Sequence, residues 1–345
     1  MKTSMMEWKA SVLNSKDRLA MPLMTHPGIT LIGHSVREAV TDHRIQYEAI
    51  RAVAERYPTA AATLIMDLSV EAEAFGAAIR IGEDEVPSIV SRTVDSAESV
   101  ERLPIPDLKS GRLSQWIAAS ELAARTITDR PVFAECIGPL SLAARLFDVG
   151  ETMTSILIEP DTILALVEKC TRFLISYCGA FKSVGANGVV IAEPVAGVLS
   201  EELCHEFSSK FIRRVVQAVQ DDGFFVVLHN CGETDQLVGS MQSTGAAGLH
   251  FGNKGDVVRA LGKVPADTLV FGNIDPVGIL KQGTPEVVHR ATASLLEKTK
   301  GLGNFVLSSG CDVAPNTPLD NIDAFFAALR EFNQAGEDVG RSKKI

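Results

Sequence analysis

The chain has 345 residues, of which 46% are hydrophobic and 22% are charged, a composition typical of a globular protein. Its formal net charge of −10 argues against nucleic acid as a partner, because phosphate backbones are bound by clustered lysine and arginine. No apolar run reaches the roughly 18 residues of a membrane helix, and the first residues lack the apolar core of a signal peptide. We therefore expect a cytoplasmic protein that binds neither nucleic acid nor membranes.

Eight short apolar runs alternate with longer segments of helical periodicity. Most are apolar throughout, as expected of strands buried on both faces of a parallel sheet. Their ranges are 19–26, 62–67, 131–136, 188–193, 224–230, 247–252, 267–275 and 304–310. This alternation predicts a single (β/α)8 TIM barrel over residues 1–345, with an N-terminal helical extension at about 1–18. An open doubly wound sheet is the alternative, but no G-x-G-x-x-G or Walker motif follows any run.

The helices between the runs have recognisable starts. Ser200 precedes two glutamates and a stretch in which apolar residues recur every four positions. Thr284 precedes Pro285, the residue type favoured at the first position of a helix. These starts support helices between the predicted strands.

The residues at the ends of the predicted strands are titratable or able to bind a metal. They are His26, Asp67, Glu135 with Cys136, Glu193, His229 with Cys231, His250, Asp275, and Cys311 with Asp312. In a (β/α)8 barrel the carboxyl ends of the strands build the active face. We therefore expect these side chains to converge on one mouth.

A histidine and two cysteines in this set form a candidate zinc site. His229 and Cys231 are separated by one residue, and Cys311 follows the last run. Zinc prefers imidazole and thiolate ligands, and three protein ligands leave the fourth position open, as in catalytic sites. The alternative is that His229 bonds a backbone carbonyl and that both cysteines are packed thiols. The residues alone leave both interpretations open.

From about residue 20 to residue 333 the chain resembles the uroporphyrinogen decarboxylase superfamily, and within it the methylcobalamin:coenzyme M methyltransferase branch of corrinoid-dependent zinc enzymes. The segments that carry this resemblance are 66–76, 138–146, 185–197, 226–232, 270–280 and 308–325. The resemblance implies a (β/α)8 barrel whose mouth holds Zn²⁺ on His229, Cys231 and Cys311. It also implies a partner corrinoid protein that carries methylcobalamin, and a thiol or another small methyl acceptor.

Further residues near the strand ends are candidates for catalysis or substrate binding. Glu193 is expected to approach the zinc, accept the thiol proton or orient His229. His250 is a candidate fourth ligand or substrate contact, with a hydrogen-bonded rim histidine as the alternative. Asp67 matches a pyrrole-binding aspartate of the decarboxylases and is a third catalytic candidate. The candidates for substrate binding are His26, Asn273, Asp275 and Asp312, although Asp275 could equally cap a helix before Pro276.

The function expected from the resemblance is methyl transfer between a corrinoid protein and a small acceptor through a zinc-activated thiolate. Zinc suits this reaction because it has no redox chemistry that competes with a cobalamin. The alternatives are a demethylase of a methylated substrate, running in reverse, and a metal-free lyase like the decarboxylases. Segment 22–30 lacks the arginine-rich stretch of the decarboxylases, which disfavours the lyase. Asn253 stands where related zinc enzymes often have an acidic ligand, so the fourth ligand stays open between His250, Glu193 and the substrate.

Overall fold

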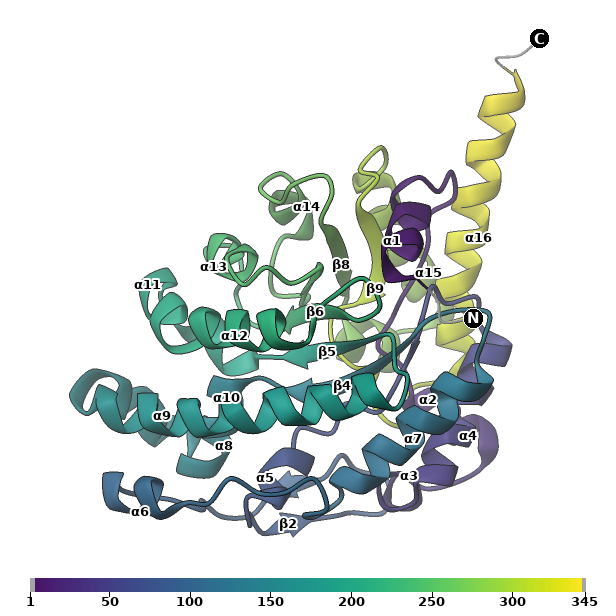
Figure 1. The fold of residues 1–345 in the computed structure, drawn as a ribbon. Helices are drawn as coiled ribbons and strands as arrows, with labels where there is room; N and C mark the ends of the chain where they lie inside the picture. Colours follow the sequence, from purple (N-terminus) through teal and green to yellow (C-terminus); the bar gives the residue numbers. More distant parts are fainter. Residues whose placement is uncertain (1–3, 343–345) are drawn as a thin grey trace.

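The computed structural model describes residues 4–342, with side-chain environments for residues 4–336. Seven parallel strands form one curved sheet in the order β1–β4–β5–β6–β7–β8–β9 (Figure 1). The strands are β1 (Ala62–Thr63), β4 (Val132–Ile137), β5 (Gly188–Ala192), β6 (Phe225–Asn230), β7 (Gly248–Phe251), β8 (Leu269–Ile274) and β9 (Phe305–Ser309). Each strand overlaps one of the predicted apolar runs.

The segment 19–23 closes the sheet into a barrel. On one side the Met21 N–H donates to the Leu307 carbonyl over 2.8 Å, and Ala20 forms a parallel bridge with Leu307. On the other side the Ala60 N–H donates to the Ala20 carbonyl over 2.7 Å, just before β1. The prediction of a (β/α)8 barrel is therefore confirmed, with the first strand shortened. The predicted run 19–26 ends early because His26 begins a helix.

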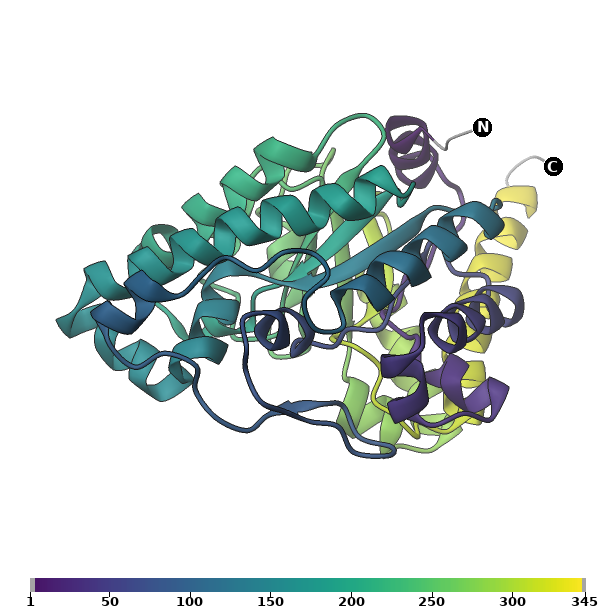
Figure 2. The same cartoon turned by 60° about the horizontal axis from the view of Figure 1, so that its bottom comes forward.

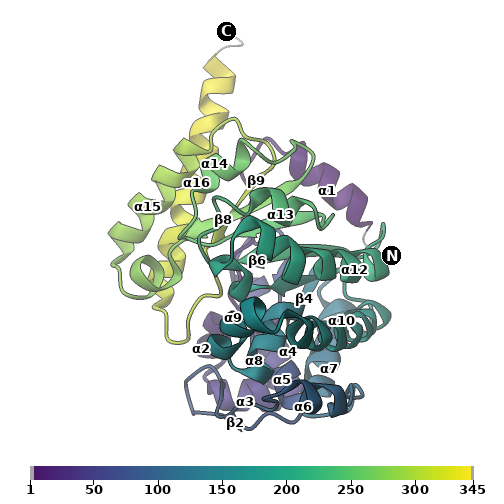
Figure 3. The ribbon, with the colours of Figure 1, turned by 90° about the vertical axis from the view of Figure 1, so that its left-hand side faces the viewer.

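Helices surround the strands, as Figure 3 shows. The main helices of this outer layer are α2 (His26–Ile32), α4 (His43–Arg56), α7 (Leu113–Thr126), α10 (Pro160–Ser183), α12 (Lys210–Val219), α15 (Pro285–Lys298) and α16 (Leu319–Ser342). The Ser200 and Thr284 side chains accept hydrogen bonds at the starts of α11 (Glu201–Cys204) and α15, as the sequence predicts. No helix within residues 4–342 is long and apolar enough to cross a membrane.

Shorter elements connect the strands to these helices. They are α3 (Val36–Thr41), α5 (Val70–Ala74), α6 (Ala97–Arg102), α8 (Pro139–Phe147), α9 (Val149–Ile158), η1 (Pro194–Val198), α11 (Glu201–Cys204), η2 (His205–Ser209), α13 (Val238–Gln242), α14 (Val257–Leu261) and η3 (Pro276–Lys281). The long connection from α5 to α7 includes a small hairpin, β2 (Ile79–Arg80) with β3 (Ser88–Ile89). Figure 2 shows this connection running outside the helical layer.

Alternation along the strands separates the barrel interior from the layer beneath the helices. Phe133, Val190, Val227 and Phe271 belong to the interior cluster, whereas their neighbours along the strands pack against helices. His229 lies two residues beyond Val227 and therefore also faces the interior. Parallel register places the Cα of His229 opposite that of His250.

Helix α1 (Met5–Leu13) covers the end of the barrel where the strands begin. Met5 and Val12 are buried within the interior cluster. The Trp8 indole N–H donates to the Ala60 carbonyl over 3.1 Å, and its ring lies 5.8 Å from that of Phe133. Within the predicted extension 1–18, residues 1–3 lie outside the part of the chain that is described. Because α1 fills one end, the candidate site lies at the opposite end, where the strands finish.

Candidate active site

His229, Cys231 and Cys311 meet at the mouth of the barrel. His229 is the penultimate residue of β6, Cys231 follows that strand directly, and Cys311 lies two residues beyond β9. One ligand atom from each side chain lies within 4.8 Å of the other two. Residues distant in sequence are therefore brought together as the barrel prediction requires.

The chemistry of these three side chains fits a zinc ion. Neither ring nitrogen of His229 has a hydrogen-bond partner among residues 4–336, although the side chain is buried. The hydrogen bond with Cys311 and the neighbouring His229 lower the pKa of the Cys231 thiol to about 4, which favours a thiolate. The hydrogen bond with Cys231, followed by burial and the charge of Cys231, raises the pKa of Cys311 well above its usual value. A free imidazole beside two sulfur atoms is a donor set that Zn²⁺ prefers.

Glycines let the two cysteine-bearing loops approach the end of β7. A Cβ on Gly252 would lie 2.5 Å from the Cα of Cys231, closer than side chains tolerate. A Cβ on Gly310, next to Cys311, would lie 2.7 Å from the backbone nitrogen of Asn253. Both close contacts are with backbone atoms, which cannot rotate away. The positions of both cysteines therefore depend on residues without a side chain.

His250 lies beside His229 but outside the group of three. The two rings are 4.5 Å apart between centroids and nearly perpendicular, at 87°. The Ser308 hydroxyl donates to the Met21 carbonyl over 2.7 Å and therefore accepts from Nε2 of His250, 2.9 Å away. This network assigns the proton of a neutral His250 to Nε2 and leaves Nδ1 as a bare acceptor. Burial lowers the pKa of His250 well below its usual value, so the ring carries no charge.

The carboxylate of Glu193 faces the helical layer. Its oxygens accept hydrogen bonds from the backbone N–H groups of Leu140, over 3.1 Å, and Ser141, over 2.6 Å, at the start of α8. The preceding residue, Ala192, faces the barrel interior, so strand alternation turns Glu193 outward. Burial raises the pKa of Glu193 to about 7. The side chain thus caps α8, while its backbone N–H donates to the His229 carbonyl over 2.9 Å.

Asp67 is engaged in a buried ion pair that the sequence did not reveal. Its Oδ2 lies 2.7 Å from Nη1 of Arg112, and its Oδ1 accepts from the Ser69 hydroxyl over 2.6 Å. Arg112 also contacts Glu73 over 2.6 Å. Arg112 lies just before α7, and no pattern near it in the sequence identifies its partners. Asp67 therefore has a clear positioning role, because this pair ties the loop after β1 to α7.

His26 and Glu135 are buried around the mouth, and Asp312 beside them is partly buried. Nδ1 of His26 lies 3.0 Å from Oδ2 of Asp312, which joins the first residue of α2 to the loop that carries Cys311. Neither carboxyl oxygen of Glu135 has a hydrogen-bond partner among residues 4–336. Burial, and then the nearby Asp312, raises the pKa of Glu135 well above its usual value. The sequence placed Glu135 at a strand end but gave it no role.

Asn273 and Asp275 make backbone contacts at the end of β8. The Asn273 side-chain amide donates to the carbonyls of Gly252 and Gly255, each over 2.9 Å. The Asp275 carboxylate accepts from the N–H groups of Val277 and Gly278, each over 2.9 Å. Asp275 thus caps η3, the alternative that the sequence offered. Asn273 holds the loop after β7, against which Cys231 packs.

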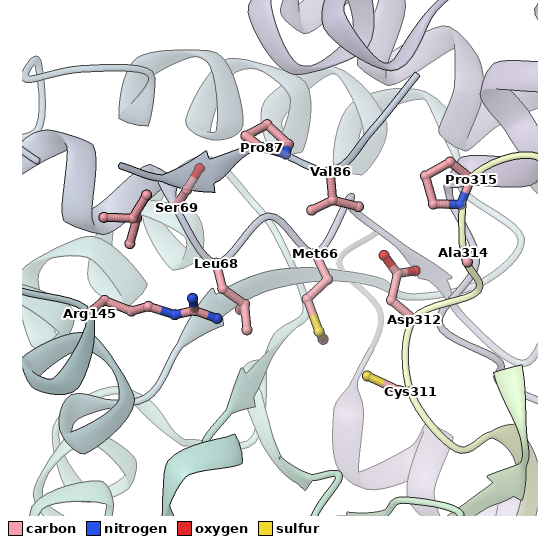
Figure 4. Close-up of a pocket in the computed structure, with 11 residues that line it drawn as sticks. Met66, Leu68, Ser69, Val86, Pro87, Arg145, Cys311, Asp312, Ala314 and Pro315 are labelled. Atoms are coloured by element: carbon pink, nitrogen blue, oxygen red, sulfur yellow. The ribbon is translucent and has the colours of Figure 1, made fainter. Parts of the chain in front are cut away.

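A pocket of ≈ 250 Å³ opens beside Cys311 (Figure 4). Its lining residues are Met66, Leu68, Ser69, Val86, Pro87, Ile89, Arg145, Cys311, Asp312, Ala314 and Pro315. Of the predicted site residues, Cys311 and Asp312 line it. Arg145 was missed because its position in α8 resembles that of a solvated charge on a helix face.

Comparisons with known proteins agree with the sequence motifs. A family model for uroporphyrinogen decarboxylase (URO-D) matches residues 18–332. A methylcobamide:CoM methyltransferase of Methanosarcina acetivorans is 29% identical over 271 residues, which cover 77% of this chain and 78% of that protein. A uroporphyrinogen decarboxylase of Coxiella burnetii is 26% identical over 297 residues, covering 82% of this chain and 80% of that protein.

A solved structure of a methyltransferase from Methanosarcina mazei shares the fold. It matches with a TM-score of 0.85 at 23% identity and covers 95% of this chain and 99% of that chain. The resemblance to the superfamily and to its methyltransferase branch is confirmed. The chain belongs to the uroporphyrinogen decarboxylase family.

Proposed function

We propose that the protein is a zinc-dependent methyltransferase that moves a methyl group between a corrinoid protein and a small thiol. The observation that carries the proposal is the meeting of His229, Cys231 and Cys311 within 4.8 Å at the barrel mouth. Relatives named as methylcobamide:CoM methyltransferases support corrinoid-linked methyl transfer. A decarboxylase that works without a metal has no need of this group of donors.

The three residues would hold the zinc and leave one coordination position open. Bound there, Zn²⁺ would act as a Lewis acid that lowers the pKa of an acceptor thiol and makes it nucleophilic at neutral pH. Cys231 favours the thiolate form before any metal binds. The neutral His250 fixes one side of the His229 ring without adding a positive charge. Gly252 and Gly310 keep the two cysteine loops in place.

The reaction joins the acceptor sulfur to the methyl carbon. A carbon–sulfur bond forms, the cobalt–carbon bond breaks, and its electron pair stays on the corrinoid. The pocket beside Cys311 is smaller than the roughly 300–1,000 Å³ typical of drug-sized ligands, which suits a small acceptor. The methyl donor is far larger and has to approach from above the mouth.

Methyl transfer from free methylcobalamin tests the proposal. With zinc-loaded protein and a thiol, we expect the visible spectrum to change from methylcobalamin to cob(I)alamin under anaerobic conditions. Cys311→Ser should lower the rate by at least about 100-fold, because it removes one of three metal ligands. Cys170→Ala, at a buried position in α10 outside the group of three donors, is the matched control.

Three outcomes would count against the proposal. A wild-type protein that loads zinc but leaves methylcobalamin unchanged with every thiol would exclude this acceptor class. Release of carbon dioxide from a tetrapyrrole carboxylate by metal-free protein would favour the lyase instead. Cob(I)alamin methylation by a methylated substrate, without the forward reaction, would assign the demethylase direction.

A further inference from the structure

A cavity of ≈ 900 Å³ lies at the end of the barrel opposite the mouth. The end of α1, the loop between α15 and β9, and α16 surround it at this end (Figure 1). The cavity shares no lining residue with the pocket beside Cys311, and it contains neither His229 nor Cys231. Its volume lies in the upper part of the roughly 300–1,000 Å³ range of small-molecule sites. The cavity is therefore large enough for an organic ligand and separate from the candidate metal centre.

Apolar side chains form part of the cavity wall. Val12 is buried at the end of α1, and Phe305 is buried at the start of β9. Leu302 and Phe332 also line the cavity and are only partly buried. An apolar ligand that covers these side chains would remove hydrophobic surface from water.

Arg18 adds a positive charge that no carboxylate neutralises. Its Nη1 donates to the carbonyls of Leu302, over 2.9 Å, and Phe305, and its Nη2 donates to that of Thr299, over 2.9 Å. Nε is buried and has no hydrogen-bond partner among residues 4–336. Neutral carbonyls hold the guanidinium in place, but they leave its charge uncompensated.

The cavity lining carries more cations than carboxylates. Lys300 pairs with Glu297 over 3.2 Å, while Lys16 forms no ion pair in the described part of the chain. Asp17 is the second carboxylate in the lining. Together with Arg18 there are three cations and two carboxylates, in a chain whose formal net charge is −10. This end of an acidic protein therefore attracts anions into the cavity.

Two backbone amides add hydrogen-bond donors to the lining. Gly301 and Gly303 are exposed in the loop before β9, and neither N–H has a protein acceptor among residues 4–336. Gly301 has a φ of 81°, which glycine adopts without strain. Free loop amides beside cationic side chains are typical of sites that bind anionic oxygens.

We propose that this cavity is a second ligand site, which binds an organic anion with an apolar body. The anionic group lies against Lys16, Lys300 and the glycine amides, and Arg18 adds positive charge behind them. The apolar body lies against Leu302 and Phe332. This site is independent of the proposed methyl transfer, because it uses none of the residues at the mouth.

Two fluorescent probes that differ in charge test this inference. One is 8-anilinonaphthalene-1-sulfonate, and the other is N-phenyl-1-naphthylamine, which has the same rings without the sulfonate. Fluorescence titration of the full-length protein gives both dissociation constants. We expect the sulfonate to bind about tenfold more tightly than the neutral probe, the size of one charge-assisted hydrogen bond.

A pair of substitutions at Gly336 shows whether the probes bind in this cavity. Gly336 lines the cavity from α16, and apart from its chain neighbours and nearby helix backbone no heavy atom lies within 4 Å of a Cβ there. Gly336→Trp should fill the space and weaken binding of both probes at least about tenfold. Gly336→Ala, the matched control, should bind both probes like wild type.

Substitution of the two lysines tests the charge preference. In the double variant Lys16→Gln, Lys300→Gln the preference for the sulfonate over the neutral probe should fall at least about threefold. Lys298→Gln, an exposed position at the end of α15 outside the lining, should keep the wild-type preference. About 0.5 M potassium chloride should reduce the preference of wild type more than that of the double variant.

Three results would overturn the second site. They are equal dissociation constants of the two probes for wild type, unchanged probe binding by folded Gly336→Trp, and a double variant with the same preference as Lys298→Gln. Cys311→Ser should bind both probes like wild type, so a failure of the metal centre leaves this test intact. Zinc content and methyl transfer should be unchanged in Gly336→Trp, so the loss of the second site would not affect the proposed function.

Discussion

The thiols of Cys231 and Cys311 lie within 4.8 Å of each other, although they follow different strands, β6 and β9. Their hydrogen bond and the neighbouring His229 lower the pKa of Cys231 to about 4. A pair with one thiol already ionised binds a cation without first losing that proton. Metal binding by these residues would therefore depend on how closely the two loops are held.

Gly252→Ala should weaken metal binding through packing alone. The added Cβ would lie 2.5 Å from the Cα of Cys231, so the Cys231 loop has to move. We expect the zinc dissociation constant to rise at least about tenfold and the free energy of unfolding to fall by about 1–3 kcal/mol. A chelator competition titration and denaturant unfolding measure the two effects.

The control for this substitution is Gly179→Ala in α10. Apart from its chain neighbours and the nearby backbone of α10 itself, no heavy atom lies within 4 Å of a Cβ at that position. This variant should bind zinc like wild type and gain up to about 1 kcal/mol of stability, because alanine favours a helix over glycine. Zinc affinity of Gly252→Ala equal to that of Gly179→Ala would show that the Cys231 loop tolerates displacement.

Glu71 should make the protein less stable as the pH rises. Burial raises the pKa of Glu71 to about 8 in the folded state, so the folded protein holds a proton that the unfolded chain releases. The contribution of Glu71 to the free energy of unfolding is complete below the pKa that this residue has in the unfolded chain. It is lost as the pH rises from there through about 8. Relative to Glu71→Gln, wild type should lose a few kcal/mol of unfolding free energy between about pH 5 and pH 9.

Glutamine at this position keeps the acceptor for the Ile137 N–H, which donates to Glu71 over 3.1 Å. Denaturant unfolding at several pH values gives the difference between the two proteins. The control is Glu121→Gln, on the exposed face of α7. Its unfolding free energy should change with pH in the same way as that of wild type, because the Glu121 carboxylate stays hydrated. Identical pH profiles for wild type and Glu71→Gln would refute the raised pKa.

The ion pair between Asp67 and Arg112 should be strongly coupled. Oδ2 of Asp67 and Nη1 of Arg112 are 2.7 Å apart, and the two side chains are 0% and 8% exposed, respectively. Removing one partner leaves a buried charge, so Arg112→Met should cost about 3–5 kcal/mol of stability. Combining it with Asp67→Asn should cost at least about 1 kcal/mol less than the sum of the single changes.

The exposed pair of Arg102 and Glu98 provides the comparison for this cycle. Nη1 of Arg102 and Oε1 of Glu98 are 3.1 Å apart, and both side chains are more than 70% exposed. Arg102→Met should change the unfolding free energy by less than about 1 kcal/mol. Additive effects of Arg112→Met and Asp67→Asn in denaturant unfolding would mean that the buried contact does not tie the loop after β1 to α7.

The sequence predicted the strands well because burial on both faces leaves a simple pattern. Runs such as 188–193 and 224–230 are mostly apolar, and each ends within one residue of the end of its strand. The meeting of His229, Cys231 and Cys311 followed from the same reasoning, since parallel strands present their carboxyl ends at one mouth. Their assignment as metal ligands came from the resemblance to the family and stays a prediction. The first run was overextended because His26 begins α2 instead of ending a strand.

Side-chain direction at the strand ends was harder to predict. Glu135 faces the interior and Glu193 faces α8, although both stand at the ends of apolar runs. A shift of one residue in strand register moves a side chain from one face of the sheet to the other. Only the register therefore decides which face each glutamate takes. Asp67 pairs with Arg112, and Asp275 accepts hydrogen bonds from backbone amides. The sequence suggested the role of Asp275 but not the ion pair of Asp67.

The most direct measurement is the zinc content of purified protein, together with the zinc X-ray absorption spectrum. We expect about one zinc per chain, coordinated by two sulfur atoms, one nitrogen and one exchangeable ligand. Cys311→Ser should lose most of the zinc or one sulfur from its coordination, whereas Cys170→Ala should keep both. Full zinc content with an unchanged sulfur count in Cys311→Ser would contradict the assignment of the metal centre.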